Sequence, residues 1–225
     1  MMEQTWPQVQ LALDLVRLQD AVRIARMAVS QGIGWLEAGT PLIKSEGMKA
    51  VKALSRNYDE ATVVADMKTL DAGSIEAEMA FHAGARVVSI SGLAHDRTVR
   101  DAVRVTTQHD GMLMADLLMA PNPLRRAREL ENLGVDIVCI HTGVDVQKAF
   151  HSKLKVGRNV RKIAKSVNIP VAAAGGVNPR LAGELLDSGV KIIVVGGWIT
   201  GSKDPSAASR RIMQRVEGSA RLGPV

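Results

Sequence analysis

The sequence predicts an α/β protein with a single domain, a closed (β/α)8 or TIM barrel, and two observations support this prediction. Short apolar runs rich in β-branched residues alternate with amphipathic runs along all 225 residues, which is typical of parallel strands that are each followed by a helix. Eight evenly spaced units in a chain of this length fit a closed barrel. We expect residues 1–217 to form the barrel and residues 218–225 to be a flexible tail. A doubly wound open sheet is the alternative, but the even spacing favours the barrel.

The expected strands are apolar runs bounded by glycine, proline or polar residues. They cover residues 8–14, 32–39, 61–68, 85–91, 111–118, 135–141, 169–176 and 191–197. Apolar residues at helical spacing predict helices between them, of which the clearest are 18–32, 74–84, 123–134, 178–189 and 204–216. In two of these, proline directly follows a capping residue, Asn178 or Asp204, as it often does where a helix begins.

The composition narrows the possible functions. Only 3% of the residues are aromatic, which argues against a protein that stacks nucleic-acid bases on exposed rings. The net charge of +6 favours anionic ligands, and phosphorylated metabolites fit as well as nucleic acid. Lysine and arginine are scattered, and their two clusters, at 123–128 and 209–215, are typical of solvated helix faces. We therefore expect no binding of nucleic acid.

The single cysteine, Cys139, lies inside an apolar run, so we expect a buried structural thiol and no disulfide within the chain. The N-terminus lacks the charged and apolar regions of a leader peptide, and no apolar run approaches membrane-spanning length. These features predict a soluble cytoplasmic protein.

Polar residues follow several of the predicted strands at their carboxyl ends, where the active site of such a barrel lies. They are Asp14, Glu37, Asp66 with Lys68, Asp116 and His141. Each has an ordinary structural explanation when taken singly, such as a solvated strand end, a structural ion pair or a core histidine. Because Asp66 and Lys68 are two residues apart, they point to the same side of a strand, and each lowers the free energy needed to bury the other. The convergence of all these strand ends favours a catalytic site.

Two glycine pairs end the seventh and eighth strand runs, in Gly175-Gly176-Val177 and Gly196-Gly197-Trp198. Glycine lets backbone N–H groups approach an anion closely, and the loops after strands seven and eight often bind phosphate in these barrels. A tight turn alone would also use glycine. Two pairs at these two positions favour a phosphorylated ligand.

Several segments together resemble one family. They are residues 12–14 (ALD), 37–47 (EAGTPLIKSEG), 65–73 (ADMKTLDAG), 141–147 (HTGVDVQ), 172–177 (AAAGGV) and 194–200 (VVGGWIT). This set is similar to the 3-hexulose-6-phosphate synthases of the orotidine-5′-phosphate decarboxylase superfamily, over about residues 9–216. The D-x-K-x-x-D signature formed by Asp66, Lys68 and Asp71 marks the superfamily, whereas GTPLIKSEG and HTGVDVQ point to the synthases and their closest relatives.

The resemblance implies a reversible aldehyde-lyase reaction that joins formaldehyde to D-ribulose 5-phosphate and gives D-arabino-hex-3-ulose 6-phosphate, through a Mg²⁺-stabilised 1,2-enediolate. Mn²⁺ is a possible substitute for Mg²⁺. The roles that it implies are metal binding by Glu37 and Asp66, substrate contact by Asp14 and Lys68, proton transfer by His141, and phosphate binding by the two glycine loops. It also implies a homodimer in which Asp71 reaches the neighbouring subunit's site. By position alone, Asp71 is equally a candidate helix N-cap.

Physical chemistry adds to these implied roles. Carboxylate ligands suit a hard cation, which in turn suits the negative oxygens of an enediolate. An ammonium group on Lys68 would add positive charge, and Asp66 would help to keep it protonated. His141 is the preferred general acid–base, with Asp14 or a water molecule as alternatives for removing the C1 proton.

Other functions remain open at this stage. A 3-keto-L-gulonate-6-phosphate decarboxylase would share the fold, the metal and Lys68, but that relative has arginine at the positions of Val144 and Gly197. A phosphate-binding barrel isomerase would not need Mg²⁺, so sensitivity to EDTA would separate it. A non-catalytic protein that binds phosphate or nucleic acid is suggested only by the charge.

Overall fold

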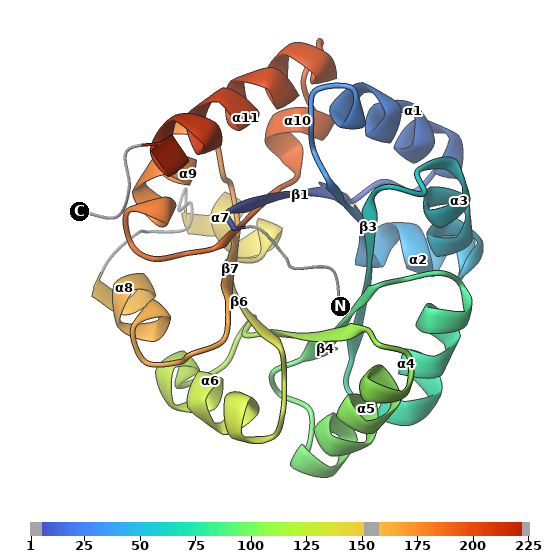
Figure 1. Ribbon diagram of the computed structural model, residues 1–225, viewed down its shortest axis with the longest axis vertical. Helices are drawn as coiled ribbons and strands as arrows, with labels where there is room; N and C mark the ends of the chain where they lie inside the picture. Colours follow the sequence, from blue (N-terminus) through green and yellow to red (C-terminus); the bar gives the residue numbers. More distant parts are fainter. Residues whose placement is uncertain (1–5, 151–157, 222–225) are drawn as a thin grey trace.

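The computed structural model describes residues 6–150 and 158–221 and shows eight parallel strands closed into a barrel, with helices around it (Figure 1). Each strand pairs with the next along the chain, and β8 pairs with β1. The (β/α)8 barrel predicted from the sequence is therefore confirmed, and the open sheet is wrong.

All eight predicted strand runs contain a strand. The strands are β1 Gln8–Leu13, β2 Trp35–Ala38, β3 Thr62–Thr69, β4 Val87–Ser91, β5 Met112–Asp116, β6 Ile137–His141, β7 Val171–Ala174 and β8 Ile192–Val195. The helices are α1 Leu18–Val29, α2 Thr40–Glu46, α3 Lys49–Asn57, α4 Gly73–His82, α5 Asp96–Gln108, α6 Pro123–Asn132, α7 Val144–Phe150, α8 Arg158–Ala164, α9 Pro179–Leu186, α10 Gly197–Thr200 and α11 Pro205–Arg221. Helix α11 includes residues 218–221, which the sequence assigned to the tail, and residues 222–225 lie outside the described chain.

The hydrophobic core has two layers, because alternate residues of each strand face opposite sides of the barrel wall. Outward-facing residues such as Leu11, Leu36 and Val88 pack under the helices in one large cluster. Inward-facing residues such as Trp35, Val64 and Met114 fill the interior. The interior is thus packed at its amino-terminal end, and polar side chains can gather only toward the carboxyl ends of the strands.

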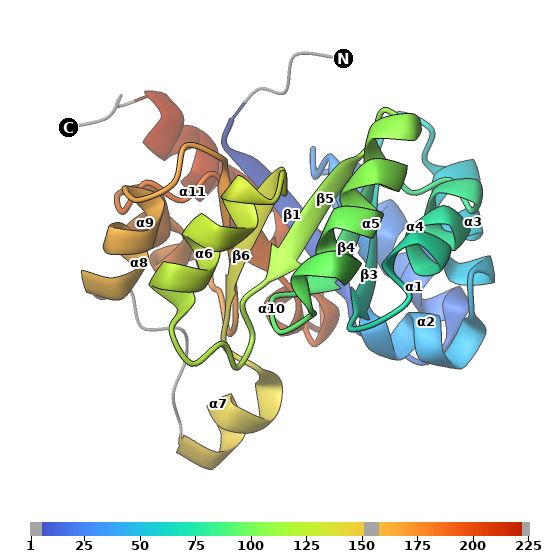
Figure 2. The same ribbon diagram turned by 90° about the horizontal axis from the view of Figure 1, so that it is seen from below.

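The strand register sets the depth of these polar side chains. Glu37 of β2 lies beside Ala12 of β1 and Val64 of β3, inside the barrel. Asp66 comes two residues after Val64 and therefore lies one layer nearer to the mouth. Helix α7 stands off the barrel at this end, opposite the end where β1 begins (Figure 2).

Two minor expectations can be compared with the fold. Cys139 is buried, and burial raises the pKa of its thiol well above the usual range, which suits a structural role. In the basic cluster at 123–128, Arg126 donates to the carbonyl oxygens of Gly92 and Ala94 and pairs with Asp96 at 2.8 Å. It therefore ties α6 to the loop after β4.

Within the described residues, no helix is long and apolar enough to cross a membrane.

Candidate active site

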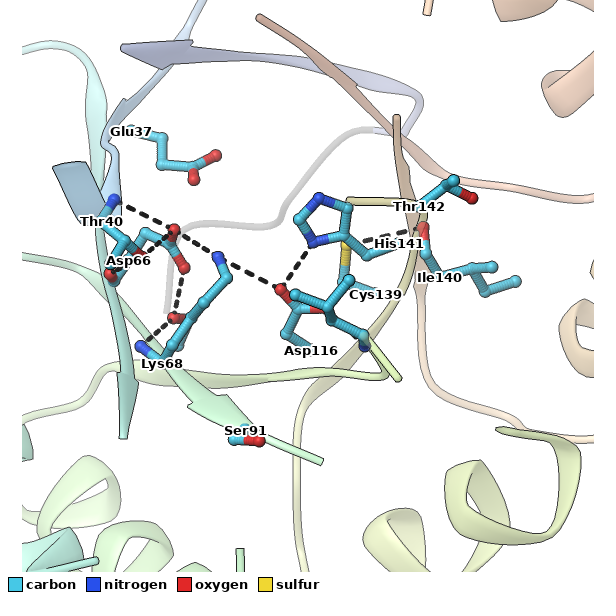
Figure 3. Close-up of polar contacts among 12 residues, drawn as sticks. Glu37, Thr40, Asp66, Lys68, Ser91, Asp116, Cys139, Ile140, His141 and Thr142 are labelled. Atoms are coloured by element: carbon cyan, nitrogen blue, oxygen red, sulfur yellow. Dashed lines mark hydrogen bonds and ion pairs between the residues drawn. The ribbon is translucent and has the colours of Figure 1, made fainter. Parts of the chain in front are cut away.

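The carboxyl ends of the strands surround one pocket of about 420 Å³. Every site residue predicted from the sequence except Asp71 lines it: Asp14, Glu37, Asp66, Lys68, Asp116, His141, Gly175, Gly176, Val177, Gly196, Gly197 and Trp198. Figure 3 shows that Asp66 and Lys68 lie on one side of this pocket and Asp116 and His141 on the other. The acidic strand ends and the two glycine loops therefore belong to a single site.

Asp66 and Lys68 lie in a bulge of β3. The register with β4 passes from Ala65–Val88 to Thr69–Ile90, so β3 advances four residues while β4 advances two. Lys68 takes the left-handed conformation, with φ at 47°. Its Nζ lies 2.5 Å from Asp66 Oδ2, so the predicted contact is present. A bulge brings the two together, where the sequence suggested a regular strand.

Asp66 is the most heavily hydrogen-bonded carboxylate of the pocket. Its Oδ2 accepts from the Thr40 N–H at 3.2 Å and from the Thr40 hydroxyl at 2.6 Å, besides Lys68. Its Oδ1 accepts from the Ser89 hydroxyl at 2.7 Å. Ser89 Oγ also accepts the backbone N–H of Lys68 at 3.0 Å, which joins β4 to the bulge. Donors from three elements thus fix the position of this carboxylate.

Lys68, Asp116 and His141 continue this network across the pocket. Lys68 Nζ lies 3.3 Å from Asp116 Oδ2, and His141 Nδ1 lies 2.8 Å from the same oxygen (Figure 3). Burial alone would lower the pKa of Lys68, but the carboxylates of Asp66 and Asp116 outweigh it and raise that pKa, so the amine stays an ammonium. Burial alone would raise the pKa of Asp116, but His141 and Lys68 lower it. An ionised Asp116 can only accept, so His141 carries a proton on Nδ1 and turns Nε2 to other partners.

Glu37 is buried, and the strand register places it level with Val64, one layer farther from the mouth than Asp66. Burial, followed by the charges of Asp66 and Asp14, raises its pKa well above the ordinary range. Gln10 donates its Nε2 hydrogen to Glu37 Oε2 at 2.5 Å. The other amide atom, Gln10 Oε1, is buried and is the one side-chain N or O atom without a partner among the buried side chains described. This corner of the pocket therefore brings several carboxyl groups close together and has an unused acceptor.

Asp14 lies at the rim of the pocket, one residue past β1. A side chain at Gly39 would place its Cβ 2.3 Å from Asp14 Oδ1, and one at Gly196 would lie 3.6 Å from Oδ2. Asp14 therefore occupies the space that Gly39 leaves open, whereas a Cβ at Gly196 would make only an ordinary contact with it. Desolvation in this position, and then the charge of Asp66, raises the pKa of Asp14.

The glycine loops follow β7 and β8 and form the wall of the pocket across from β3. Gly175 and Gly176 have φ angles of 125° and 65°, so only glycine takes the first without strain. A Cβ at Gly175 would lie 2.7 Å from the backbone oxygen of Thr142. Gly197 begins the short helix α10, and a Cβ there would meet nothing within 4 Å. The first loop therefore requires glycine at position 175 for its conformation, whereas a side chain could be accommodated at position 197.

Asp71 lies outside the pocket and is exposed. Helix α4 has Ala72 as its N-cap and no side-chain hydrogen bond at that position. The helix-cap explanation for Asp71 is therefore wrong.

Three residues that donate hydrogen bonds to the carboxylates of the pocket were absent from the sequence prediction: Gln10, Thr40 and Ser89. Gln10 is polar at an inward position of β1, a signal that strand alternation could have revealed. Ser89 is the corresponding inward polar residue of β4, the strand for which no site residue was proposed. Thr40 is recognisable only from the approach of α2 to β3, which the sequence does not show.

Comparisons with known proteins agree with this architecture. Residues 7–212 match the Orotidine 5'-phosphate decarboxylase / HUMPS family. A 3-hexulose-6-phosphate synthase from Staphylococcus haemolyticus is 35% identical over 211 residues, which cover 94% of this chain and 99% of that protein. The crystal structure of a 3-hexulose-6-phosphate synthase has a TM-score of 0.86 at 33% identity and covers 93% of this chain and 99% of its own. A 3-keto-L-gulonate-6-phosphate decarboxylase from Vibrio cholerae has a TM-score of 0.84 at 27% identity and covers 98% and 100%. The synthase and the decarboxylase share this fold, so the residues that line the pocket must determine which of the two reactions is catalysed.

Proposed function

Because the chain belongs to the Orotidine 5'-phosphate decarboxylase / HUMPS family, we propose that it catalyses the reversible aldol condensation of formaldehyde with D-ribulose 5-phosphate, which gives D-arabino-hex-3-ulose 6-phosphate. The observation that carries this proposal is the single pocket that joins the Asp66–Lys68–Asp116–His141 network to two glycine loops. The network suits the reacting end of a sugar, and the loops suit its phosphate.

The difficult step is removal of a proton from C1 of the pentulose, which leaves negative charge on the enediolate oxygens. The Lys68 ammonium can stabilise that charge, because two carboxylates hold it protonated and directed across the pocket. A Schiff base would need a neutral amine, which its raised pKa disfavours. Lys68 therefore acts as a fixed positive charge.

Proton transfer needs groups that change their protonation state within reach of the substrate. His141 presents Nε2 to the pocket while Asp116 holds Nδ1, and Asp14 stands at the rim with a raised pKa. One of these takes the C1 proton. The carbanion then attacks the formaldehyde carbon to form the new C–C bond, the π bond of formaldehyde breaks, and its oxygen receives a proton, while the ketone of the pentulose is restored.

The pocket also fits a divalent cation, with Glu37 and Asp66 as its ligands. Asp14, Glu37, Asp66 and Asp116 place four carboxyl groups around one ammonium, and Gln10 Oε1 is left without a partner. Hard oxygen donors of this kind suit Mg²⁺, with Mn²⁺ as an alternative. When bound, the cation would supply positive charge to the oxygens of the enediolate.

The phosphate is proposed to lie against Gly175–Val177 and Gly196–Trp198. These segments follow β7 and β8, and the short α10 begins at the second of them. Loops at these two positions, together with the start of a short extra helix, form the phosphate site of many (β/α)8 barrels. Backbone N–H groups would make the contacts, because the described pocket lining contains no arginine.

The decarboxylase is the second candidate, and the pocket disfavours it. Its substrate carries a carboxylate as well as a phosphate, so it needs positive charge for two anions. Lys68 is the only lysine or arginine among the described pocket-lining residues, and it already contacts two carboxylates. Val144 and Gly197, which stand where the decarboxylase pattern has arginine, both line the pocket.

A homodimer in which Asp71 serves the partner's site is also proposed. Asp71 is exposed, and the segments after β3 and β4 and helix α4 also expose large apolar side chains, namely Leu70, Ile75, Met79 and Leu93, which are 47% to 63% exposed. Exposed apolar side chains on these elements suit association with a second copy. A cytoplasmic location stays a prediction.

The test is an assay of the purified full chain with D-ribulose 5-phosphate, formaldehyde and Mg²⁺, in which the loss of formaldehyde is followed. We expect loss that requires the pentulose phosphate and stops on addition of EDTA. Release of CO₂ from 3-keto-L-gulonate 6-phosphate without consumption of formaldehyde would favour the decarboxylase. Formaldehyde consumption that is unchanged in EDTA would refute the metal ligands proposed here.

A further inference from the structure

A second cluster of metal-ligating side chains lies away from the pocket. Glu78 and His82 are one turn apart on α4, and His109 directly follows α5. One donor atom from each residue can be chosen so that all three lie within 4.8 Å of one another. We propose that these three residues form a Zn²⁺ site that braces α4 against α5.

The carboxylate of Glu78 lies between the two imidazoles. Its Oε2 is 3.0 Å from His109 Nε2, and its Oε1 is 3.7 Å from His82 Nε2. Ligand atoms bound tetrahedrally to zinc at about 2.0–2.1 Å lie about 3.3 Å apart, so these two separations need little change, and the separation of the two imidazole nitrogens lies within 4.8 Å. Both rings present Nε2 to the same carboxylate, as a shared ion requires.

The orientation of the rings agrees with this reading. The His82 and His109 centroids are 5.4 Å apart at an angle of 84°. Two imidazoles on one tetrahedral zinc have centroids about 5 Å apart. His109 also stacks on Phe81, with centroids 5.0 Å apart, so one ligand is held in place before the ion arrives.

The donor set selects zinc over the cation proposed for the pocket. Two imidazoles and a carboxylate suit Zn²⁺ and later first-row metals, whereas Mg²⁺ prefers oxygen donors. Three protein ligands leave the fourth zinc position to water, since the His82 side chain is 69% exposed.

The position of the cluster indicates a structural role. His82 ends α4, and His109 comes shortly before β5 begins at Met112. The helices of the barrel run opposite to its strands, so both residues lie at the end away from the pocket, where barrels carry determinants of stability. The ion would join two positions 27 residues apart in sequence, on helices that pack together.

The experiment measures Zn²⁺ binding by equilibrium dialysis of the full chain in excess Mg²⁺, together with the thermal midpoint. The variants are His82→Gln and Glu78→Gln. The control is His95→Asn, which removes an exposed histidine elsewhere and keeps an acceptor for the N–H of Arg97. We expect both variants to bind one zinc fewer per chain than wild type, with at least about 100-fold weaker affinity at this site, because even an outer-shell change costs about 10–100-fold.

Zinc should raise the thermal midpoint of wild type and the control but not that of His82→Gln. Formaldehyde consumption without zinc should be equal in all of them, since the cluster lies away from the pocket. Equal zinc binding by wild type and His82→Gln would overturn the proposal. Half a zinc per chain, with association of chains that depends on His82, would also overturn it, because the site would then lie between two copies.

Discussion

Ser89 is predicted to hold the bulge of β3 that carries Asp66 and Lys68. In the Ser89→Ala variant, Asp66 loses one donor and the Lys68 N–H loses its acceptor. A lost hydrogen bond to a charged group costs about 1.5–3 kcal/mol, and a buried N–H without a partner costs about 1–3 kcal/mol. The free energy of unfolding should therefore fall by about 2.5–6 kcal/mol. In a chain of this size that corresponds to a fall of roughly 10 °C in the thermal midpoint.

The assay is urea unfolding, with Mg²⁺ affinity measured in parallel. If Asp66 is a metal ligand, loss of its outer-shell partner should weaken Mg²⁺ binding by about 10–100-fold. Ser91→Ala is the matched control, because Ser91 follows on the same strand and accepts only an exposed N–H at 3.2 Å. That control should change the stability by less than about 0.5 kcal/mol. If Ser89→Ala behaves like the control, the bulge is held by other contacts and the reasoning is refuted.

The remaining predictions concern the metal, the phosphate and the dimer. The pKa of Glu37 is raised in the folded chain, so the folded metal-free chain keeps a proton on Glu37 at pH values where the unfolded chain has lost it. The free energy of unfolding of the metal-free chain should therefore fall as the pH rises from 4.5 toward the raised pKa of Glu37. Glu37→Gln should remove this dependence in urea titrations with EDTA and should abolish Mg²⁺ binding, and an unchanged pH profile would contradict the assignment. Gly175→Ala should lower both the stability and the phosphate affinity, because φ at this residue is 125° and the new Cβ would lie 2.7 Å from a backbone oxygen. Gly197→Ala should leave the stability unchanged, because a Cβ there would meet nothing within 4 Å. Equal unfolding midpoints for these two variants would count against the loop assignment. Mixing inactive Asp71→Ala and Lys68→Ala chains should restore up to half of wild-type activity in each heterodimer, and verified heterodimers without activity would rule out shared sites.

The strand pattern was readable from the sequence because each strand is an apolar run with a sharp polar or glycine boundary. In a parallel barrel all carboxyl ends meet at one mouth, so the convergence of Asp14, Glu37, Asp116 and His141 followed from topology alone. Helices were less readable where their start signals were unusual. Helix α5 is capped by the His95 side chain, which accepts from the N–H of Arg97, and histidine is not among the usual capping residues.

The supporting residues of the site were not predictable in the same way. Thr40 contacts Asp66 across 26 positions in sequence, and Ser89 does so across 23. Such contacts depend on the register between strands and on how α2 approaches the barrel, and neither is encoded in local spacing. Asp71 is a different case, because the structure excludes its capping role, and the role proposed for it in a dimer depends on contacts between chains that no local pattern encodes.

Lys68 takes a left-handed backbone conformation that the barrel fold does not require. A residue other than glycine with φ at 47° is strained, at a cost of about 1–3 kcal/mol. Glycine would relieve that strain but would place no ammonium between Asp66 and Asp116. The surrounding structure compensates through the Lys68 N–H bond to Ser89 and the ion pairs themselves. The strain at Lys68 thus accompanies a fixed positive charge in the pocket, as is common where side chains are held in place at active sites.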